Sequence, residues 1–132
     1  MSNISYMRQA LVLVFLTAPL GACGFVHDEH IDGPYRLVAI DVSEEMAICY
    51  EIEDGCVGRI PGTVYAIGFD AKYLVAARHP DNDQSKTEYY YLTRALDGPL
   101  VDPSATVSGP YSADEFEFEI TRLELPPISR TL

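Results

Sequence analysis

The side chains best suited to chemistry in this sequence are those of three cysteines and three histidines. Cys49 and Cys56 flank a short acidic segment that ends in Asp54-Gly55. Two thiolates alone cannot complete a zinc site, and a redox centre would ordinarily need the spacing Cys-x-x-Cys. Two outcomes therefore remain open. The pair forms a structural disulfide, or it stays as two free thiols, with Cys49 facing a sheet and Cys56 beyond a tight turn.

Two of the histidines lie close together near the amino terminus. His27 and His30 enclose Asp28 and Glu29, and such a cluster would bind a divalent metal only if it formed a helical turn. Gly24 and Gly33-Pro34 bracket the cluster and supply no helical frame. We therefore expect a solvated tether here and no metal site.

Hydrolytic chemistry has few candidate residues. His79 precedes Pro80 where a predicted strand ends, and no nucleophile motif accompanies it. A small hydrolase would need two or three of His79, Asp70, Glu88 and Ser85 to converge in one cleft. The sequence has no glycine-rich phosphate loop, nucleophile elbow or HExxH motif. We expect a protein that is not an enzyme and needs no cofactor.

The composition restricts the remaining possibilities. The chain has 132 residues, of which 48% are hydrophobic and 22% are charged, so it can build one packed domain. Twenty acidic residues against nine basic ones give a formal net charge of -11. Because neutralising phosphates requires an excess of Lys and Arg, we expect no nucleic-acid partner.

The first 22 residues differ from the rest of the chain. A polar start containing Arg8 precedes an apolar run over residues 10–20. As a helix this run would reach about 16 Å, roughly half the thickness of the hydrocarbon layer of a bilayer. A short apolar run of this kind, followed by small residues, is typical of a secretory signal peptide.

The end of that segment is more specific. Leu20-Gly21-Ala22-Cys23 resembles the lipobox of bacterial lipoprotein precursors. The resemblance implies that Cys23 is alkylated with diacylglycerol, that cleavage falls before it, and that the new amino group is acylated. Gly24 in place of Asp is similar to the pattern that directs such proteins to the outer membrane, so we expect its periplasmic face.

Lipidation of Cys23 would leave two cysteines in an exported chain. Exported compartments favour disulfides, which makes the bridge between Cys49 and Cys56 the preferred outcome. Such a bridge would contribute about 2 kcal/mol by constraining the unfolded chain. Cleavage would also remove Arg8 while keeping all twenty acidic residues, so the processed protein would be still more negative.

The hydrophobic pattern of the remaining chain predicts strands followed by one helix. We expect a polar tether over residues 23–33 and a single α+β domain over residues 34–132. This domain would hold an antiparallel sheet of five or six strands with one C-terminal helix packed on it. Expected strands cover residues 35–41, 46–52, 56–60, 63–67, 73–78 and 87–94, and residues 97–110 are expected to be irregular.

The helix prediction depends on its start and stop signals. Ser112 and Glu115 have the spacing of a capping box, and Phe116, Ile120 and Leu123 repeat at helical spacing. Pro126-Pro127 would end the helix. Strand-like alternation over residues 114–120 is the competing pattern.

A weaker resemblance concerns the domain itself. An ordered set of short segments is similar to an uncharacterised family of small bacterial lipoproteins: Ile60-Pro61, Ile67-Gly68-Phe69-Asp70, Tyr73-Leu74-Val75, Tyr90-Tyr91-Leu92, Gly109-Pro110-Tyr111-Ser112 and Glu115-Phe116. The resemblance covers about 70 residues and implies only the outline of the domain. It brings no activity with it.

Candidate partner-binding residues are aromatic and acidic. In a strand, Tyr89 and Tyr91 share one face while Tyr90 takes the other, and an exposed tyrosine face suits protein partners. The acidic candidates are Glu44, Glu45, Glu51, Glu53 and Asp54. Core packing for the tyrosines and a solubilising role for the acids are the alternatives.

We therefore expect a lipid-anchored envelope protein that binds another protein. The negative charge suits a basic partner, so an inhibitor or immunity protein against a basic toxin or cell-wall hydrolase is the sharper version. The alternative is a structural or maintenance lipoprotein that docks to an outer-membrane assembly.

Overall fold

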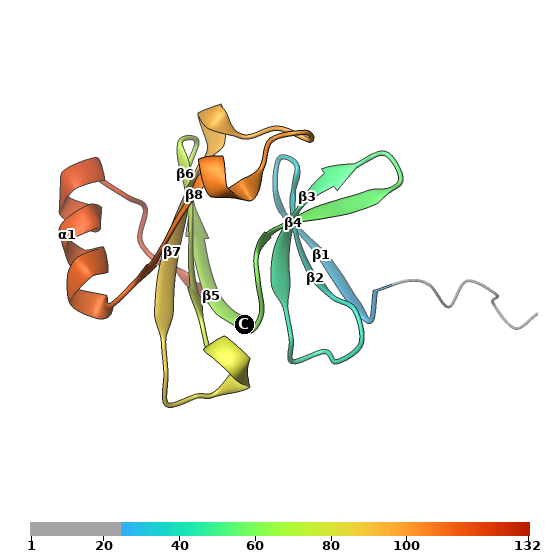
Figure 1. Ribbon diagram of the computed structural model, residues 1–132, viewed down its shortest axis with the longest axis horizontal. Coiled ribbons are helices and arrows are strands. Elements are labelled where there is room, and N and C mark those ends of the chain that lie inside the picture. Colours follow the sequence, from blue (N-terminus) through green and yellow to red (C-terminus); the bar gives the residue numbers. More distant parts are fainter. Residues whose placement is uncertain (1–24) are drawn as a thin grey trace, which may run out of the picture.

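A computed structural model describes residues 25–132 of the chain. The predicted signal peptide and Cys23 lie outside the described residues. The described chain forms three layers, in which two antiparallel sheets face each other and one helix covers the far side of the second sheet (Figure 1).

The strands divide between the sheets by their order in the chain. The four-stranded sheet has the order β1-β2-β3-β4 and contains β1 (His27–Asp32), β2 (Tyr35–Ala39), β3 (Ala47–Ile52) and β4 (Gly55–Ile60). The five-stranded sheet has the order β8-β7-β6-β5-β9 and contains β5 (Val64–Phe69), β6 (Tyr73–Arg78), β7 (Glu88–Thr93), β8 (Val107–Tyr111) and β9 (Arg130–Thr131). The helices are α1 (Ala113–Leu123) and the short 3-10 turns η2 (Pro80–Asn82), η3 (Arg94–Leu96) and η4 (Pro103–Ala105).

The predicted α+β class and the C-terminal helix are confirmed. The Ser112 hydroxyl accepts from the Glu115 backbone N–H at 3.2 Å, and the Glu115 carboxylate accepts from the Ser112 N–H at 2.8 Å. The sequence indicated one sheet, whereas the structure has two. The chain leaves the first sheet after β4 and starts the second at β5, because each sheet buries its apolar face against the other.

The prediction of a polar tether is wrong for residues 27–32, which form strand β1 and pair antiparallel with β2. Ile31 is buried in the core, and two acidic residues are held by basic side chains instead of by water alone. Asp28 accepts from Arg36 at 2.6 Å, and Glu29 pairs with Arg130 of β9. These contacts turn a polar segment into an edge strand, so the folded body begins close to Phe25.

Strand β8 also lies in a region that was expected to be irregular. It pairs only with β7 and forms the edge of the five-stranded sheet. An edge position tolerates Gly109 and Pro110, because a strand edge leaves some backbone groups without ladder partners. The prediction of irregular structure is thus wrong for residues 107–110, whereas residues 97–106 contain no strand.

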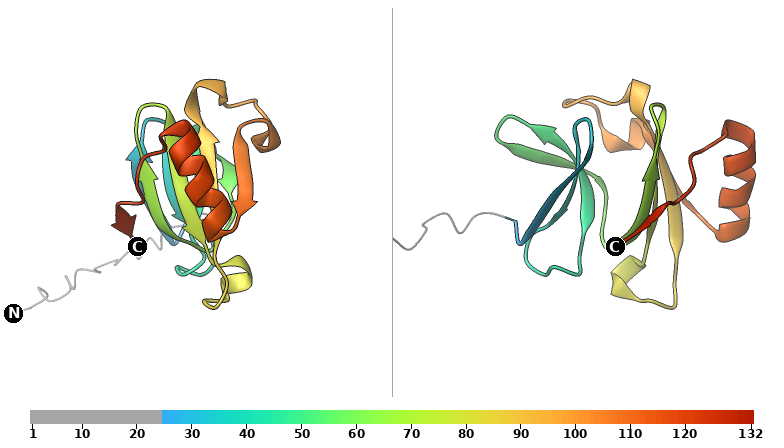
Figure 2. Two further views of the ribbon diagram at one scale, coloured as in Figure 1. Left: turned by 90° about the vertical axis from the view of Figure 1, so that its left-hand side faces the viewer. Right: turned by 180° about the vertical axis from the view of Figure 1, so that it is seen from behind.

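Two apolar clusters hold the layers together. The larger lies between the sheets and contains Tyr35, Leu37, Ile48, Ile60, Val64, Ile67, Leu74 and Leu92, all at most 1% exposed. The smaller lies between the five-stranded sheet and α1 and contains Val75, Tyr91, Phe116 and Leu125. Figure 2 shows α1 lying across the outer face of that sheet.

The long segment between β7 and β8 is fastened to the four-stranded sheet by two arginines. Arg94 pairs with Asp32 of β1 at 2.7 Å and donates to the Asp70 carbonyl at 2.6 Å. Arg59 of β4 pairs with Asp97 at 2.9 Å. These contacts connect the sheets at the end opposite to the start of the described chain (Figure 1).

Candidate functional site

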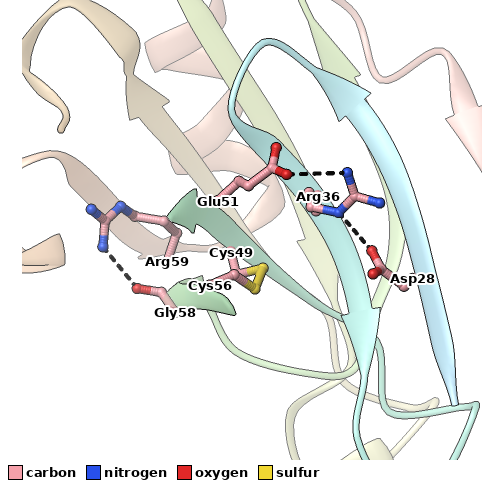
Figure 3. The surroundings of a disulfide bond; sticks show 7 residues. All are labelled: Asp28, Arg36, Cys49, Glu51, Cys56, Gly58 and Arg59. Carbon is pink, nitrogen blue, oxygen red and sulfur yellow. Dashed lines mark hydrogen bonds and ion pairs between the residues drawn. A yellow bond between two sulfur atoms is a disulfide. The ribbon is translucent and has the colours of Figure 1, made fainter. Parts of the chain in front are cut away.

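The predicted disulfide is present between Cys49 of β3 and Cys56 of β4. Their Cα atoms are 5.6 Å apart, and the two residues are diagonal neighbours across the β3–β4 pair. The ion pairs of Arg36 with Asp28 and Glu51 lie on neighbouring strands (Figure 3). The bridge fixes the hairpin, and the alternative of two free thiols is excluded.

Tyr89 and Tyr91 were predicted to offer a surface to a partner protein, but the structure buries that face inside the domain. Tyr89 and Tyr91 share a face as predicted, but α1 covers it. Tyr89 stacks on Phe116 with ring centroids 5.0 Å apart, and Tyr91 is 7% exposed. The strand pattern gave the correct shared face but could not indicate which face the helix would cover.

The five acidic candidates are exposed but do not form one surface. Glu51, Glu53 and Asp54 belong to the β3–β4 hairpin, whereas Glu44 and Glu45 precede β3. Glu44 and Glu45 therefore lie at the opposite end of β3 from Glu53 and Asp54.

The candidate hydrolytic residues do not form a catalytic arrangement. Asp70 lies in the β5–β6 turn, at the opposite end of β6 from His79. The Ser85 hydroxyl donates to Asp83 at 2.6 Å, and Glu88 pairs with Arg78 at 3.1 Å. Each of these side chains has a local partner outside the proposed set.

His27 and His30 both lie in β1 but on opposite faces of the strand. His27 contacts Glu29, and His30 bonds the Gly33 carbonyl at 2.9 Å. Residues three apart in a strand point to opposite faces, so the two rings cannot hold one metal ion. Within residues 25–132, no group of three or more His, Cys, Asp or Glu side chains is arranged to hold a metal.

Glu44 and Glu45, two of the predicted acidic residues, border a concave site that we call the acidic groove. It combines a pocket of about 300 Å³ with an adjoining polar pocket, and the two share Thr63 and Asn82. The residues of the acidic groove are Ser43, Glu44, Glu45, Met46, Gly62, Thr63, Val64, Tyr65, His79, Asp81, Asn82, Gln84 and Leu132. They come from the β2–β3 loop, the β4–β5 link, β5, the β6–β7 loop and the residue after β9.

Backbone hydrogen bonds join these loops into one unit. The Val64 N–H donates to the Met46 carbonyl at 2.7 Å, which fixes the β2–β3 loop beside β5. Thr63 and His79 exchange N–H···O bonds at 3.2 and 2.8 Å. Arg78 donates to the Gly62 carbonyl through Nε at 2.9 Å and through Nη2 at 2.5 Å. The groove walls are therefore held in place by both sheets.

Two stacked aromatic rings line the groove. The rings of Tyr65 and His79 are stacked with centroids 3.9 Å apart and planes 7° from parallel. His79 Nδ1 lies 2.9 Å from the Lys86 carbonyl, which holds the ring in this orientation. Such a flat face suits a flat cation or an aliphatic stem.

One wall of the groove has an unusual backbone conformation. Asp81 and Asn82 both have a φ of 54°, in the left-handed region that costs non-glycine residues energy. Asp and Asn tolerate this region better than other side chains. The turn is retained because the Asn82 N–H donates to the His79 carbonyl at 3.1 Å.

The electrostatics of the groove are unbalanced. Within the described part of the chain, Glu44, Glu45 and Asp81 take part in no ion pair. Arg78, which lies behind the groove, is already bound to Glu88 and to the Gly62 carbonyl. Three exposed carboxylates beside apolar and aromatic side chains can accept an organic cation.

Sequence reasoning found only two residues of this groove as binding candidates. It missed Tyr65 and Asp81, and it treated His79 only as a candidate base. The one local signal was the turn chemistry of Pro80-Asp81-Asn82. Assembly of the groove depends on contacts between loops that are far apart in the sequence.

Comparisons with known proteins do not extend this description. No protein-family model, curated protein or solved structure matches the chain. Among the described residues, no helix is both long enough and apolar enough to cross a membrane.

Proposed function

We propose that this chain is a non-enzymatic lipoprotein of the bacterial cell envelope that binds a basic protein through the acidic groove. The Leu20-Gly21-Ala22-Cys23 sequence supports attachment to a membrane through lipid on Cys23. The disulfide between Cys49 and Cys56 supports an oxidising compartment outside the cytoplasm.

The observation that carries the binding proposal is the set of three carboxylates, without ion pairs among residues 25–132, that border the groove with the stacked Tyr65–His79 pair. An arginine of the partner would lay its guanidinium on the aromatic face and direct its N–H groups to Glu44 or Asp81. A lysine would place its stem against Met46 and its ammonium at the carboxylates. A volume of about 300 Å³ is suited to one such side chain.

The rest of the chain would increase the rate of encounter. A formal net charge of -11 attracts basic proteins before contact and repels acidic ones. Basic secreted toxins and basic cell-wall hydrolases fit this requirement. Occupation of the groove by one of their surface side chains would hold the domain over the partner as an inhibitor or immunity protein.

Two matched triple variants test the proposal. Glu44→Gln, Glu45→Gln and Asp81→Asn together remove the charge of the groove, and Asn keeps a residue that tolerates the left-handed backbone. Glu51→Gln, Glu53→Gln and Asp54→Asn remove the same charge from the β3–β4 hairpin. Binding of a panel of basic and acidic cell-wall hydrolases would be measured by calorimetry at two salt concentrations.

We expect only the groove variant to lose affinity for a basic partner. The wild type should bind a basic hydrolase more weakly at high salt than at low salt. At the same salt concentration, the groove variant should bind that hydrolase at least tenfold more weakly than the wild type does. The hairpin variant should change the dissociation constant by less than about threefold, since its charges lie far from the groove. Equal losses in both variants, or wild-type binding that is indifferent to partner charge, would contradict the proposal.

A further inference from the structure

Four exposed apolar residues lie at the chain start and in the segment after β2, outside the acidic groove. We call them the anchor-side patch: Phe25, Val26, Ile40 and Val42, which are 37%, 56%, 64% and 44% exposed. The Val26 N–H donates to the Ala39 carbonyl at 2.8 Å, so the first described residues lie beside the β2–β3 loop. Figure 1 shows the start of the described chain next to that loop.

We infer that the anchor-side patch lies on the surface of the lipid bilayer that holds Cys23. The inference rests on the proposed lipidation of that residue. It adds a fixed orientation, in which the described domain lies against the membrane and does not extend from it on a tether.

Covalent reach gives the first argument. Phe25 is two residues after Cys23, so the backbone between them spans at most about 7 Å. The residues that were expected to form a longer tether are used in β1, which pairs with β2 and carries the Glu29–Arg130 contact to the second sheet. A lipid on Cys23 would therefore hold Phe25 close to the bilayer, and with it the neighbouring end of β2.

The chemistry of the patch gives the second argument. Its four exposed side chains are aliphatic or aromatic, and such surfaces on soluble domains mark contacts with membranes or proteins. The neighbouring charge of Asp28 is compensated by Arg36 at 2.6 Å, which lowers the cost of bringing this strand close to lipid. Contact with the interface would remove apolar area from water beside the anchor.

The acidic residues limit how deeply this end can enter. Asp41, Glu44 and Glu45 are exposed and unpaired within the described residues, and their carboxylates must remain hydrated. The patch would therefore occupy the headgroup region, with the acidic groove opening just above it. Basic proteins collect at anionic membrane surfaces, so a partner would reach the groove at that level.

Spin-label depth measurements test the inference on the acylated protein in phosphatidylcholine vesicles. Single labels would be attached at Val42→Cys in the patch, Glu45→Cys beside the groove and Leu100→Cys at the opposite end. Leu100 is 97% exposed and provides a matched control. Cys49 and Cys56 are bonded to each other and would not react with the label.

The accessibility of each label to oxygen and to a water-soluble nickel chelate reports its depth. We expect the Val42 label to be at least threefold less accessible to nickel than the Leu100 label, with the Glu45 label still accessible. Equal nickel accessibility at Val42 and Leu100, in protein that floats with vesicles, would overturn the inference and leave lipidation standing. Protein that does not float with vesicles would overturn both. Protection of Val42 that appears only after a protein partner is added would assign the patch to that partner and also overturn the inference.

Discussion

Arg59 and Asp97 form an ion pair in which both side chains are 0% exposed. Arg59 Nε donates to Asp97 Oδ2 at 2.9 Å, and Arg59 Nη2 donates to the Gly98 carbonyl at 2.7 Å. The Tyr35 hydroxyl donates to the same carboxylate oxygen at 2.8 Å. Burial, followed by this bond to Asp97, raises the pKa of Tyr35, so its hydroxyl stays protonated and keeps donating. The pair thus connects β4, β2 and the segment after β7.

Breaking this pair on one side should cost more than removing it entirely. Asp97→Leu leaves the Arg59 charge, and Arg59→Met leaves the Asp97 charge, buried without a partner, so each should lower the free energy of unfolding by about 3–5 kcal/mol. The double variant Arg59→Met with Asp97→Leu removes both charges and should cost less than either single variant. Urea unfolding of the four proteins gives the coupling energy. Additive losses would show that the two groups are not coupled.

Gly68 should be intolerant of even a methyl group. A Cβ at this position would overlap the carbonyl of Pro127, which runs directly over β5, whereas a Cβ at Gly58 would meet nothing within 4 Å. Gly68→Ala should therefore lower the free energy of unfolding by about 1–3 kcal/mol through overpacking. Gly58→Ala is the matched control in β4 and should be close to neutral in the same denaturant experiment. Similar values for both would contradict the packing of the Pro127 segment on β5.

The disulfide should contribute to stability without controlling binding. Replacing Cys49 and Cys56 together by Ala should lower the free energy of unfolding by about 2 kcal/mol, because the bridge closes a short loop in the unfolded chain. Affinity for a basic partner should change by less than about twofold, since the acidic groove contains neither cysteine. Loss of partner binding in a variant that is still folded would link the hairpin to the binding surface.

The start of α1 should show acid sensitivity. The Ser112 backbone N–H, and then its side chain, lower the pKa of Glu115 below its ordinary value. A lowered folded-state pKa gives stability that is present above the ordinary pKa and is lost as the pH falls through the folded-state value. Glu115→Gln should therefore reduce the loss of stability in acid, seen in thermal unfolding followed from pH 6 downwards.

Ser112→Ala provides the comparison for that cap. It removes the acceptor for the Glu115 N–H and should cost about 1 kcal/mol at neutral pH. Identical acid profiles for wild type and Glu115→Gln would show that the carboxylate does not stabilise the helix.

Local patterns in the sequence predicted most of the elements. Alternation placed β6 over residues 73–78 with the bounds that the structure has, and the Asp54-Gly55 signal marked the β3–β4 hairpin. Ser112 and Glu115 predicted the start of α1, because a capping box needs only contacts three residues apart. The disulfide followed from the even number of cysteines left once Cys23 was assigned to lipid.

Features that depend on contacts between distant residues could not be predicted. The polar composition of residues 27–32 gave no sign that Arg36 and Arg130 would pair with their acids. Likewise, Arg59 and Asp97 are 38 positions apart, and nothing in their sequence neighbours indicates that they meet. The acidic groove has the same origin, since Glu44 and Asp81 reach it from different sheets.

The mass of the membrane-associated protein shows whether Cys23 carries lipid. We expect the wild-type protein to be recovered from membranes as residues 23–132 with acyl chains on Cys23. Cys23→Ser should abolish the acyl mass and release the protein from membranes. Recovery of an unacylated wild-type protein in the soluble fraction, or of one that retains residues 1–22, would rule out the lipid anchor.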